Sequence, residues 1–401
     1  MLDVLIIAHF TQIPGETGNG RFHYIAEKID KTNAIVEIVT TSFSHRTKYQ
    51  RKVNNEQVNN LSYKLTMLYE PGYQKNVSLK RFYSHYIMGK SLKNYLNNRK
   101  KPDVIYCAVP SLDVAKVAAQ YAKKNNVRFI IDIQDLWPEA FKMVFHVPII
   151  SDIIFYPIRR QADYVYSTAD EIIAVSETYV NRALRVNKKC KKGSSVFLGT
   201  ELTYFDKLAE GNKLRFKPQN EIWLAYIGTL GHSYDLSCVI DAIALVKDKY
   251  KIKFIVMGDG PLKNKFERYA KKRGIYADFM GRLDYGKMVS ILTSCDIAVN
   301  PISCGAAQSI INKHGDYAAA GLPVLNTQEC PEYRKLISEY NAGFNCDNNN
   351  AIDLAEKLVQ LCEDVDLRSV MGQNSRRLAE EKFDREFTYP TIIEIILRNL
   401  T

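Results

Sequence analysis

The chain has 401 residues, of which 46% are hydrophobic and 25% charged, with a net charge of +11 and a pI near 9.0. This length exceeds what one compact core accommodates and predicts two domains. The positive charge favours an anionic partner, which could be nucleic acid, a phosphorylated substrate or a membrane surface. No segment approaches the ~20 uninterrupted apolar residues of a transmembrane helix. The eight cysteines form no CxxC pair that would indicate a zinc site, so we expect reduced cytosolic thiols.

The first half of the chain alternates apolar runs with helical segments. Buried parallel strands are predicted at residues 4–8, 35–40, 104–108, 129–133, 171–175 and 194–198. Gly15, Gly18 and Gly20 form a glycine-rich loop after the first strand, and Arg21 opens the next helix. Such a loop is either a phosphate cradle or an ordinary strand-to-helix turn.

Two segments of this half could meet a membrane. Residues 80–101, KRFYSHYIMGKSLKNYLNNRKK, combine many cations with apolar side chains at roughly helical spacing. They predict either a core-packed helix with a solvated basic face or an interfacial helix drawn to anionic lipid, where each cation contributes ~1 kcal/mol. Residues 143–158 are strongly apolar but interrupted by Pro148 and Pro157, and they predict a half-buried interfacial segment or a helix beneath the core.

The run DIQDLWPEAF, residues 132–141, follows the strand at 129–133. Ligands bind at the carboxyl ends of the strands in open α/β sheets. Asp132, Gln134, Asp135 and Glu139 are therefore site candidates. The alternative is that Asp135 caps the following turn and Trp137 packs in the core.

The second half restarts the alternation after a charge-mixed run, residues 204–220, which predicts a linker. Strands are predicted at residues 222–227, 252–257, 277–280, 297–301 and 324–326. Glycine-rich loops follow three of them, at residues 228–231, 258–261 and 281–283. Two consecutive series of this kind predict two Rossmann-like domains that face a cleft.

The stretch SIINKHGDYAAAGLPVL, residues 309–325, places Lys313 and Asp316 on one face of a helix. Gly321 predicts the helix end, and Pro323 the start of the next strand. A surface ion pair worth only ~0.2–0.5 kcal/mol is the simplest interpretation. The neighbouring strand-end loops favour a second one, in which both side chains bind a ligand.

Taken in order, these motifs resemble the glycosyltransferases of family 4, which have the GT-B fold, and among them the bacterial surface-polysaccharide members with a D-x-x-D-LWPE segment. The resemblance covers nearly the whole chain. It implies an acceptor-binding domain at 1–203, a nucleotide-sugar-binding domain at 204–385, and a C-terminal helix, 386–401, that crosses back to the first domain. It also implies retaining, metal-independent transfer from a UDP-sugar to a lipid-linked or polysaccharide acceptor in capsule, O-antigen or exopolysaccharide synthesis. An N-acetylhexosamine is one candidate sugar.

The resemblance also assigns roles to residues. Asp316 takes the place that holds the ribose hydroxyls, and Lys313 the place that contacts the diphosphate and stabilises the leaving group. Acceptor activation falls to Asp135 or Asp132, and acceptor binding to Gln134 and Glu139. The expected donor site comprises Gly18, Gly20, Arg21, Gly228, Thr229, Leu230, Gly231, Met257, Gly258, Gly281, Arg282, Leu283, Gln308, Ser309, Lys313 and Asp316.

Two positions depart from the family pattern, because Gln308 stands where members usually have Glu and Gln134 where many have His. No metal or cofactor is expected, and the DxD at residues 364–366 is interpreted as solvated surface. We expect a cytoplasmic enzyme in peripheral contact with the inner face of an anionic cell membrane, with no nucleic acid partner. Two alternatives stay open: a UDP-sugar epimerase of the same architecture, and a non-catalytic protein that binds anionic polymer.

Overall fold

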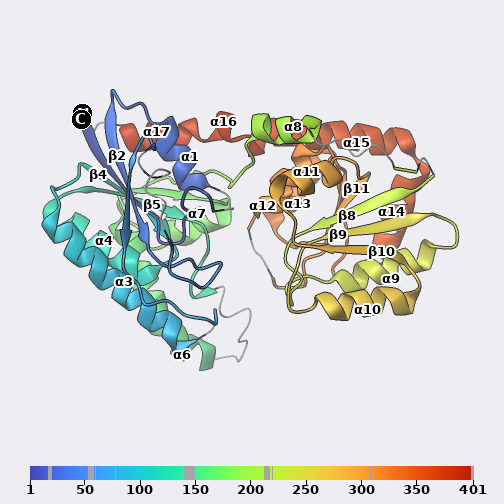
Figure 1. Ribbon diagram of the computed structural model, residues 1–401, viewed down its shortest axis with the longest axis horizontal. Coiled ribbons are helices and arrows are strands. Elements are labelled where there is room, and N and C mark those ends of the chain that lie inside the picture. Colours follow the sequence, from blue (N-terminus) through green and yellow to red (C-terminus); the bar gives the residue numbers. More distant parts are fainter. Residues whose placement is uncertain are drawn as a thin grey trace. The chain divides into compact units, whose positions relative to one another are not determined.

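The computed structural model describes residues 1–16, 20–52, 58, 60–76, 78–139, 150–211, 217–218, 220–306 and 309–398. The chain divides into two compact units (Figure 1). Unit 1 comprises Met1–Val196 and Tyr389–Thr401, and unit 2 comprises Phe197–Thr388. Each unit holds one parallel sheet flanked by helices, which confirms the predicted pair of α/β halves.

Unit 1 is built on a seven-stranded sheet in the order β3-β2-β1-β4-β5-β6-β7. Its strands are β1 (Leu2–Ile7), β2 (Ala34–Thr41), β3 (Lys64–Leu68), β4 (Val104–Val109), β5 (Arg128–Ile133), β6 (Glu171–Ala174) and β7 (Ser194–Ser195). Its helices are α1 (Arg21–Lys28), α3 (Leu79–Asn98), α4 (Leu112–Asn125), α6 (Ile150–Thr168), α7 (Glu177–Leu184) and α17 (Pro390–Leu397). β1 lies between β2 and β4 and is buried from Val4 to Ile7, as expected of a parallel strand covered on both faces.

The C-terminal helix α17 belongs to the core of unit 1. Ile392 and Ile396 pack in the same apolar cluster as Val4 of β1. Arg128, at the start of β5, donates hydrogen bonds to the carbonyls of Ile395, Ile396 and Arg398 at 2.6, 3.2 and 2.9 Å, which satisfies carbonyls that the end of a helix leaves free. The last helix therefore returns to the unit in which the chain begins.

Unit 2 has a six-stranded sheet in the order β10-β9-β8-β11-β12-β13. Its strands are β8 (Ile222–Ile227), β9 (Ile252–Met257), β10 (Tyr276–Gly281), β11 (Ile297–Asn300), β12 (Val324–Asn326) and β13 (Gly343–Asn345). Its helices are α8 (Leu202–Gly211), α9 (Leu236–Val246), α10 (Lys263–Arg273), α11 (Tyr285–Leu292), α12 (Asn312–Ala319), α13 (Pro331–Tyr340), α14 (Ala351–Glu363), α15 (Val365–Leu378), a π-helical turn (Ala379–Phe383) and α16 (Arg385–Thr388). Alternate residues of β8 enter two separate apolar clusters, so both faces of this sheet are buried.

The linker prediction for residues 204–220 is wrong in its first part, where α8 forms. Leu202 and Phe205 are buried on one face of this helix, and Asp206 forms an ion pair with Arg376 of α15 at 2.7 Å. These contacts override the polar composition that indicated a linker. β3 and β13 were not predicted.

The basic helix α3 combines features of both interpretations. It buries Met88, Leu92 and Leu96, whereas Phe82 and Tyr86 are exposed. Of the predicted apolar segment 143–158, residues 143–149 lie outside the described residues, and the rest forms the start of α6. Within the described part of the chain, no helix is long and apolar enough to cross a membrane.

Candidate functional site

Lys313 of α12 is a buried cation that has no hydrogen-bond acceptor among the described residues. Its side chain is 6% exposed, and its Nζ atom lies 4.6 Å from the ring centre of Tyr226 and 4.4 Å from that of Tyr234. Among the described residues no atom accepts a hydrogen bond from this Nζ. Burial lowers the pKa of Lys313 from its ordinary value of 10.5 to about 7. The two aromatic faces compensate the charge only in part, so the ammonium can gain much from an anion.

Asp316 lies one turn further along α12 and does not form the surface ion pair with Lys313 that its spacing allows. Its Oδ1 atom accepts hydrogen bonds from the Tyr285 hydroxyl at 2.9 Å and from Thr200 Oγ1 at 3.2 Å. Burial raises the pKa of this carboxyl, and the two hydrogen bonds oppose the rise. Within the described part of the chain Oδ2 accepts no hydrogen bond, which leaves it available to a hydroxyl-bearing ligand.

The loop after β8 offers fewer free amides than the sequence implied. The amides of Gly228 and Leu230 donate to the carbonyls of Met257 and Asp259 at 3.1 and 2.9 Å, so neither is available to a ligand. Gly258 is required here, since a Cβ atom on it would lie 1.8 Å from the Gly228 carbonyl oxygen. Among the described residues, the amides of Thr229 and Gly231 donate no backbone hydrogen bond and are therefore available to a ligand.

The other predicted donor residues of unit 2 are distributed around strand ends. Gly281 closes β10 with a φ of 69°, Arg282 after it is exposed, and Leu283 packs against the core. Met257 is buried at the end of β9. Ser309 is buried, and its carbonyl accepts a hydrogen bond from Gln328 Nε2 at 2.8 Å. Gln308 lies outside the described residues.

We correct the prediction that Arg21 and Asp132 contact a ligand, because the two side chains bind each other. Arg21 donates from Nε to Asp132 Oδ2 at 2.7 Å and from Nη2 to Oδ1 at 3.2 Å, and their side chains are 2% and 0% exposed. The hydroxyl of Tyr106 also donates to Asp132, at 2.6 Å. This buried pair ties α1 to the end of β5, and we withdraw both residues from the candidates for ligand contact. Gly20, whose amide donates to Gln12, precedes α1 with a φ of 69°, and Gly18 lies outside the described residues.

Asp135 is the carboxylate of the DIQDLWPEAF run that remains suited to chemistry. Burial raises its pKa to about 6, although the Leu136 amide donates to Oδ1 at 2.9 Å. Glu139 instead forms an ion pair with Arg182 at 2.6 Å. Gln134 has a buried Nε2 that donates to no atom of the described residues.

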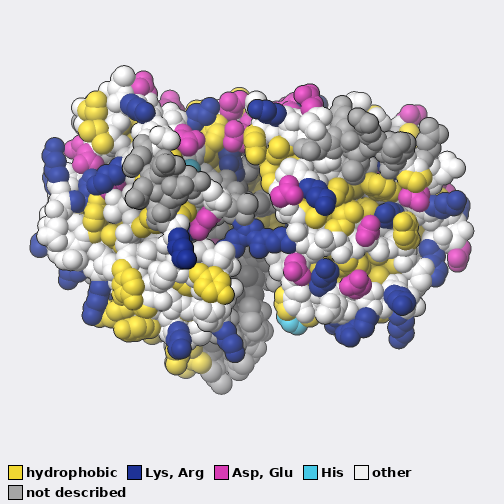
Figure 2. Space-filling view, viewed as in Figure 1, with side chains coloured by type: hydrophobic (Ala, Val, Ile, Leu, Met, Phe, Trp, Pro, Cys, Tyr) yellow, Lys and Arg dark blue, Asp and Glu magenta, His cyan; other side chains and the backbone are white. Residues whose placement is uncertain are grey.

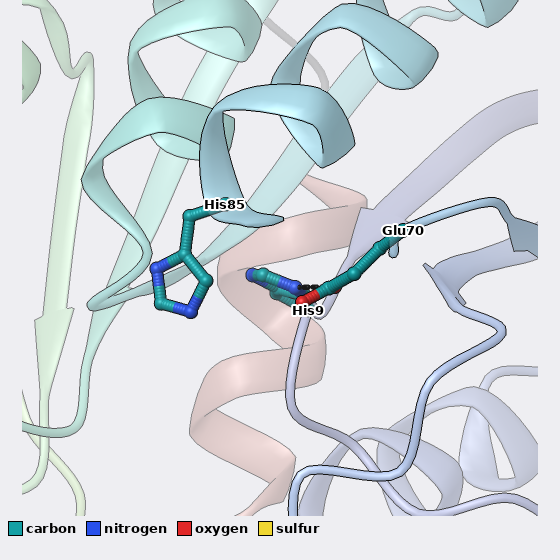
Figure 3. Close-up of side chains that lie close together, drawn as sticks. All are labelled: His9, Glu70 and His85. Atoms are coloured by element: carbon teal, nitrogen blue, oxygen red, sulfur yellow. Dashed lines mark hydrogen bonds and ion pairs between the residues drawn. The ribbon is translucent and has the colours of Figure 1, made fainter. Parts of the chain in front are cut away.

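A group that the sequence did not reveal lies at the carboxyl edge of the same sheet. His85 of α3 points its ring toward His9, and Glu70 reaches His9 from the other side (Figure 3). His9 Nε2 lies 2.5 Å from Glu70 Oε2, and His9 Nδ1 lies 2.5 Å from Ser111 Oγ. One ligand atom from each of His9, Glu70 and His85 lies within 4.8 Å of the others, so this group could hold a metal ion. His9 lies 61 positions from Glu70 and 102 positions from Ser111 in the chain, which explains why no local motif indicates the group.

Other partners in the site also come from distant positions. Tyr226 lies inside β8, Tyr234 lies in the loop before α9, and Tyr285 begins α11. Each of these tyrosines is an ordinary packing residue by sequence. Only the fold brings them to α12.

Comparison with known proteins finds similarity to glycosyltransferases. Residues 211–378 match the family model described as Glycosyl transferases group 1, a region that includes Lys313 and Asp316. MJ1069, an uncharacterized glycosyltransferase of Methanocaldococcus jannaschii, is 25% identical over 226 residues, which are 55% of this chain and 56% of that protein. WbjE, a probable glycosyltransferase of Pseudomonas aeruginosa, is 27% identical over 273 residues, or 64% of this chain and 67% of that one. The chain thus matches between about half and two thirds of these relatives' length.

A solved structure gives the architecture. HepE of Anabaena, in complex with UDP-glucose, has a TM-score of 0.67 to this chain at 14% identity and covers 98% of this chain and 99% of its own. The chain therefore has the GT-B fold, with two parallel-sheet α/β units. Together, the family model, the relatives and this architecture support a glycosyltransferase of the GT-B fold.

Proposed function

We propose that the chain is a retaining, metal-independent glycosyltransferase that moves a sugar from a UDP-linked donor to a lipid-linked or polysaccharide acceptor. The product would belong to a bacterial surface glycan, as the resemblance carried by the D-x-x-D-LWPE segment implies. The unpaired ammonium of Lys313 carries this proposal, because a buried cation without a counterion is costly until an anion binds it. The UDP-glucose complex of HepE supports a UDP-linked donor.

The donor half of the reaction needs stabilisation of a leaving group. Negative charge accumulates on the departing UDP as the bond between the anomeric carbon and the phosphate oxygen breaks. Lys313 would meet that charge, helped by the free amides of Thr229 and Gly231. Removal of one well-placed donor of this kind typically costs ~10²–10³ in rate. Asp316 would hold the ribose hydroxyls through Oδ2.

The acceptor half needs an oriented hydroxyl. We assign this task to Asp135, which at neutral pH is mostly ionised and can accept the hydroxyl proton in a hydrogen bond. In a front-face reaction the acceptor oxygen forms its bond to the anomeric carbon on the side that UDP leaves. The hydroxyl proton passes to the departing phosphate oxygen, so the products are the glycoside and UDP.

We further propose that unit 1 contacts an anionic membrane. α3 exposes Leu79, Phe82, Tyr83 and Tyr86, and α6 exposes Ile153, Ile154 and Tyr156. Figure 2 shows hydrophobic side chains beside Lys and Arg in the region where Figure 1 labels these helices. Apolar side chains surrounded by cations suit the surface of an anionic bilayer. This contact would bring the enzyme to a lipid-linked acceptor at the inner face of the cell membrane.

The test incubates the full chain with a UDP-N-acetylhexosamine, with and without a lipid-linked saccharide, and separates the products. Release of UDP together with acceptor-dependent joining of the sugar, with retained anomeric configuration, is the expected result. Formation of a free epimeric UDP-sugar without transfer would instead identify the epimerase alternative and overturn the proposal.

A further inference from the structure

A second partly buried cation lies in unit 1, at the start of α3. The guanidinium of Arg81 lies 4.7 Å from the ring centre of Trp137 and 5.6 Å from that of Tyr73. Its Nη1 atom donates to the carbonyl of Asn76 at 2.9 Å, and its buried Nε atom donates to no atom of the described residues. Arg81 is thus held in place by neutral groups and retains an unused donor.

Lys48 approaches the same tyrosine from the loop after β2. Its Nζ atom lies 4.7 Å from the ring centre of Tyr73 and donates to Asn76 Oδ1 at 2.6 Å. Its backbone is in the left-handed region, with a φ of 63°, which is unfavourable for a residue with a side chain. Backbone strain of this kind costs on the order of 1 kcal/mol and concentrates at functional sites.

Each of the two cations makes it less favourable for the other to stay charged. Burial and the charge of Arg81 lower the pKa of Lys48, and burial together with the charges of Lys48 and Arg81 lowers the pKa of the neighbouring His45 to about 4. Two carboxylates influence Arg81, those of Asp135 and Glu70. Glu70 is already bound to His9 and to Ser84 Oγ, and in the described part of the chain neither carboxylate forms an ion pair with Arg81 or Lys48.

The position of Arg81 in its helix adds an independent observation. The first turn of α3 contains Lys80 and Arg81 and no acidic residue. Cations at a helix N-terminus oppose the helix dipole, which favours anions there. The start of this helix therefore presents a positive end and two cations, and no acidic residue of its first turn balances them.

We propose that Arg81 and Lys48 form a binding site for the phosphate or diphosphate group of the acceptor. This inference rests on the proposed function, and it narrows the acceptor to a substrate linked through a phosphate ester. Arginine suits this ligand because its planar donors match two phosphate oxygens, and Lys48 adds a point charge. The guanidinium of Arg81 lies over the ring of Trp137, two residues after Asp135, so the bound phosphate would lie beside the segment that carries the carboxylate proposed to orient the acceptor hydroxyl.

The group of His9, Glu70 and His85 offers a competing explanation, in which a metal ion holds the phosphate. His85 Nε2 is buried without a hydrogen-bond partner among the described residues, as a ligand nitrogen would be. Its surroundings argue against a divalent cation. Both ring nitrogens of His9 are already engaged, Nε2 by Glu70 Oε2 and Nδ1 by Ser111 Oγ at 2.5 Å each, so a metal ion would have to displace one of these contacts.

The test measures binding of inorganic pyrophosphate and of farnesyl diphosphate to the full chain by calorimetry, with UDP present at saturation to occupy the donor site. We expect both ligands to bind, and Arg81→Gln and Lys48→Gln each to weaken binding about tenfold or more, the usual loss for one hydrogen bond to a charged group. Lys90→Gln, an exposed cation on the same helix, is the matched control and should bind as the wild type does. Tighter binding of farnesyl diphosphate would identify a lipid-linked source, and equal binding a soluble one.

Three results would overturn the proposal: no pyrophosphate binding to the wild-type chain, equal binding by all three variants, or binding that is lost in EDTA and restored by Zn²⁺. If Arg81→Gln proves unstable, Arg81→Lys takes its place in the test. This variant keeps the charge but not the paired donors, so its affinity for pyrophosphate should lie between those of the wild type and a variant without the charge. UDP binding is recorded separately in each variant. Failure of the proposed function would remove UDP binding itself, whereas failure of this inference would leave it intact.

Discussion

Replacement of Lys313 by Met should make the protein more stable at neutral pH while it weakens UDP binding. The physical reason is that folding moves this ammonium into a buried site, which lowers its pKa from 10.5 to about 7. Each pH unit of displacement corresponds to ~1.4 kcal/mol, so the charged form costs the folded state about 5 kcal/mol. At pH 7 this cost falls to about 4 kcal/mol because half of the folded molecules release the proton. Methionine has no charge to bury, and it loses only the contacts with two tyrosine rings, worth roughly 1–2 kcal/mol. We expect a net gain of about 2–3 kcal/mol at pH 7.

The pH dependence of the free energy of unfolding tests the direction of this effect. Between pH 7 and 10.5 the unfolded chain keeps the Lys313 proton and the folded chain releases it, so the wild-type free energy of unfolding rises with pH in this window. Lys313→Met should lack this rise. Urea unfolding from pH 6 to 10 measures it, with Lys287→Met, an exposed lysine of α11, as the matched control.

The same variant should bind UDP about tenfold to a hundredfold more weakly, the loss expected for one hydrogen bond to a charged group. Calorimetric titration with UDP at pH 6.5 measures this, and Lys287→Met should bind normally. The reasoning is refuted if Lys313→Met is less stable than the wild type at pH 7 with the same pH slope, or if it retains full UDP affinity.

The remaining predictions concern three carboxylates. Asp316→Asn should keep the hydrogen bonds from Tyr285 and Thr200 but weaken UDP binding about tenfold, and unchanged affinity in a titration would remove Asp316 from the donor site. Because Asp135 must be ionised to accept a strong hydrogen bond from the acceptor hydroxyl, kcat/KM should rise as the pH increases through about 6, and Asp135→Asn should lose that rise together with about tenfold or more of the rate. Asp132→Asn leaves Arg21 buried without its partner and should lower the free energy of unfolding by ~3–5 kcal/mol without a change in UDP affinity; a stable variant with weak UDP binding would restore Asp132 to the site.

The sequence predicted the sheets well where strands are uniformly buried. β8, β9 and β12 begin and end at the predicted residues, because continuous apolar runs mark strands covered on both faces. β3 and β13 were missed since most of their residues are only partly buried at the edges of their sheets. A sequence pattern predicts a strand from the burial of its residues, and edge strands of this kind bury few residues.

Within the candidate site, local spacing was informative and long-range pairing was not. The Lys313 and Asp316 spacing correctly predicted a helix that contains both residues, but the tyrosines that surround them come from other elements. Arg21 and Asp132 show the opposite case, because both appeared available to a ligand until the fold paired them. A charge in a sequence does not reveal whether another charge neutralises it 111 residues away.

A thermal-shift panel of nucleotide sugars tests the central claim most directly. A ligand present at 100 times its Kd adds ~2.7 kcal/mol to the stability of the state that binds it. We predict that UDP and UDP-sugars raise the Tm of the wild-type chain and of Lys287→Met, and that this rise falls to about half or less in Lys313→Met. A panel in which no nucleotide sugar changes the Tm of the wild-type chain would contradict the account.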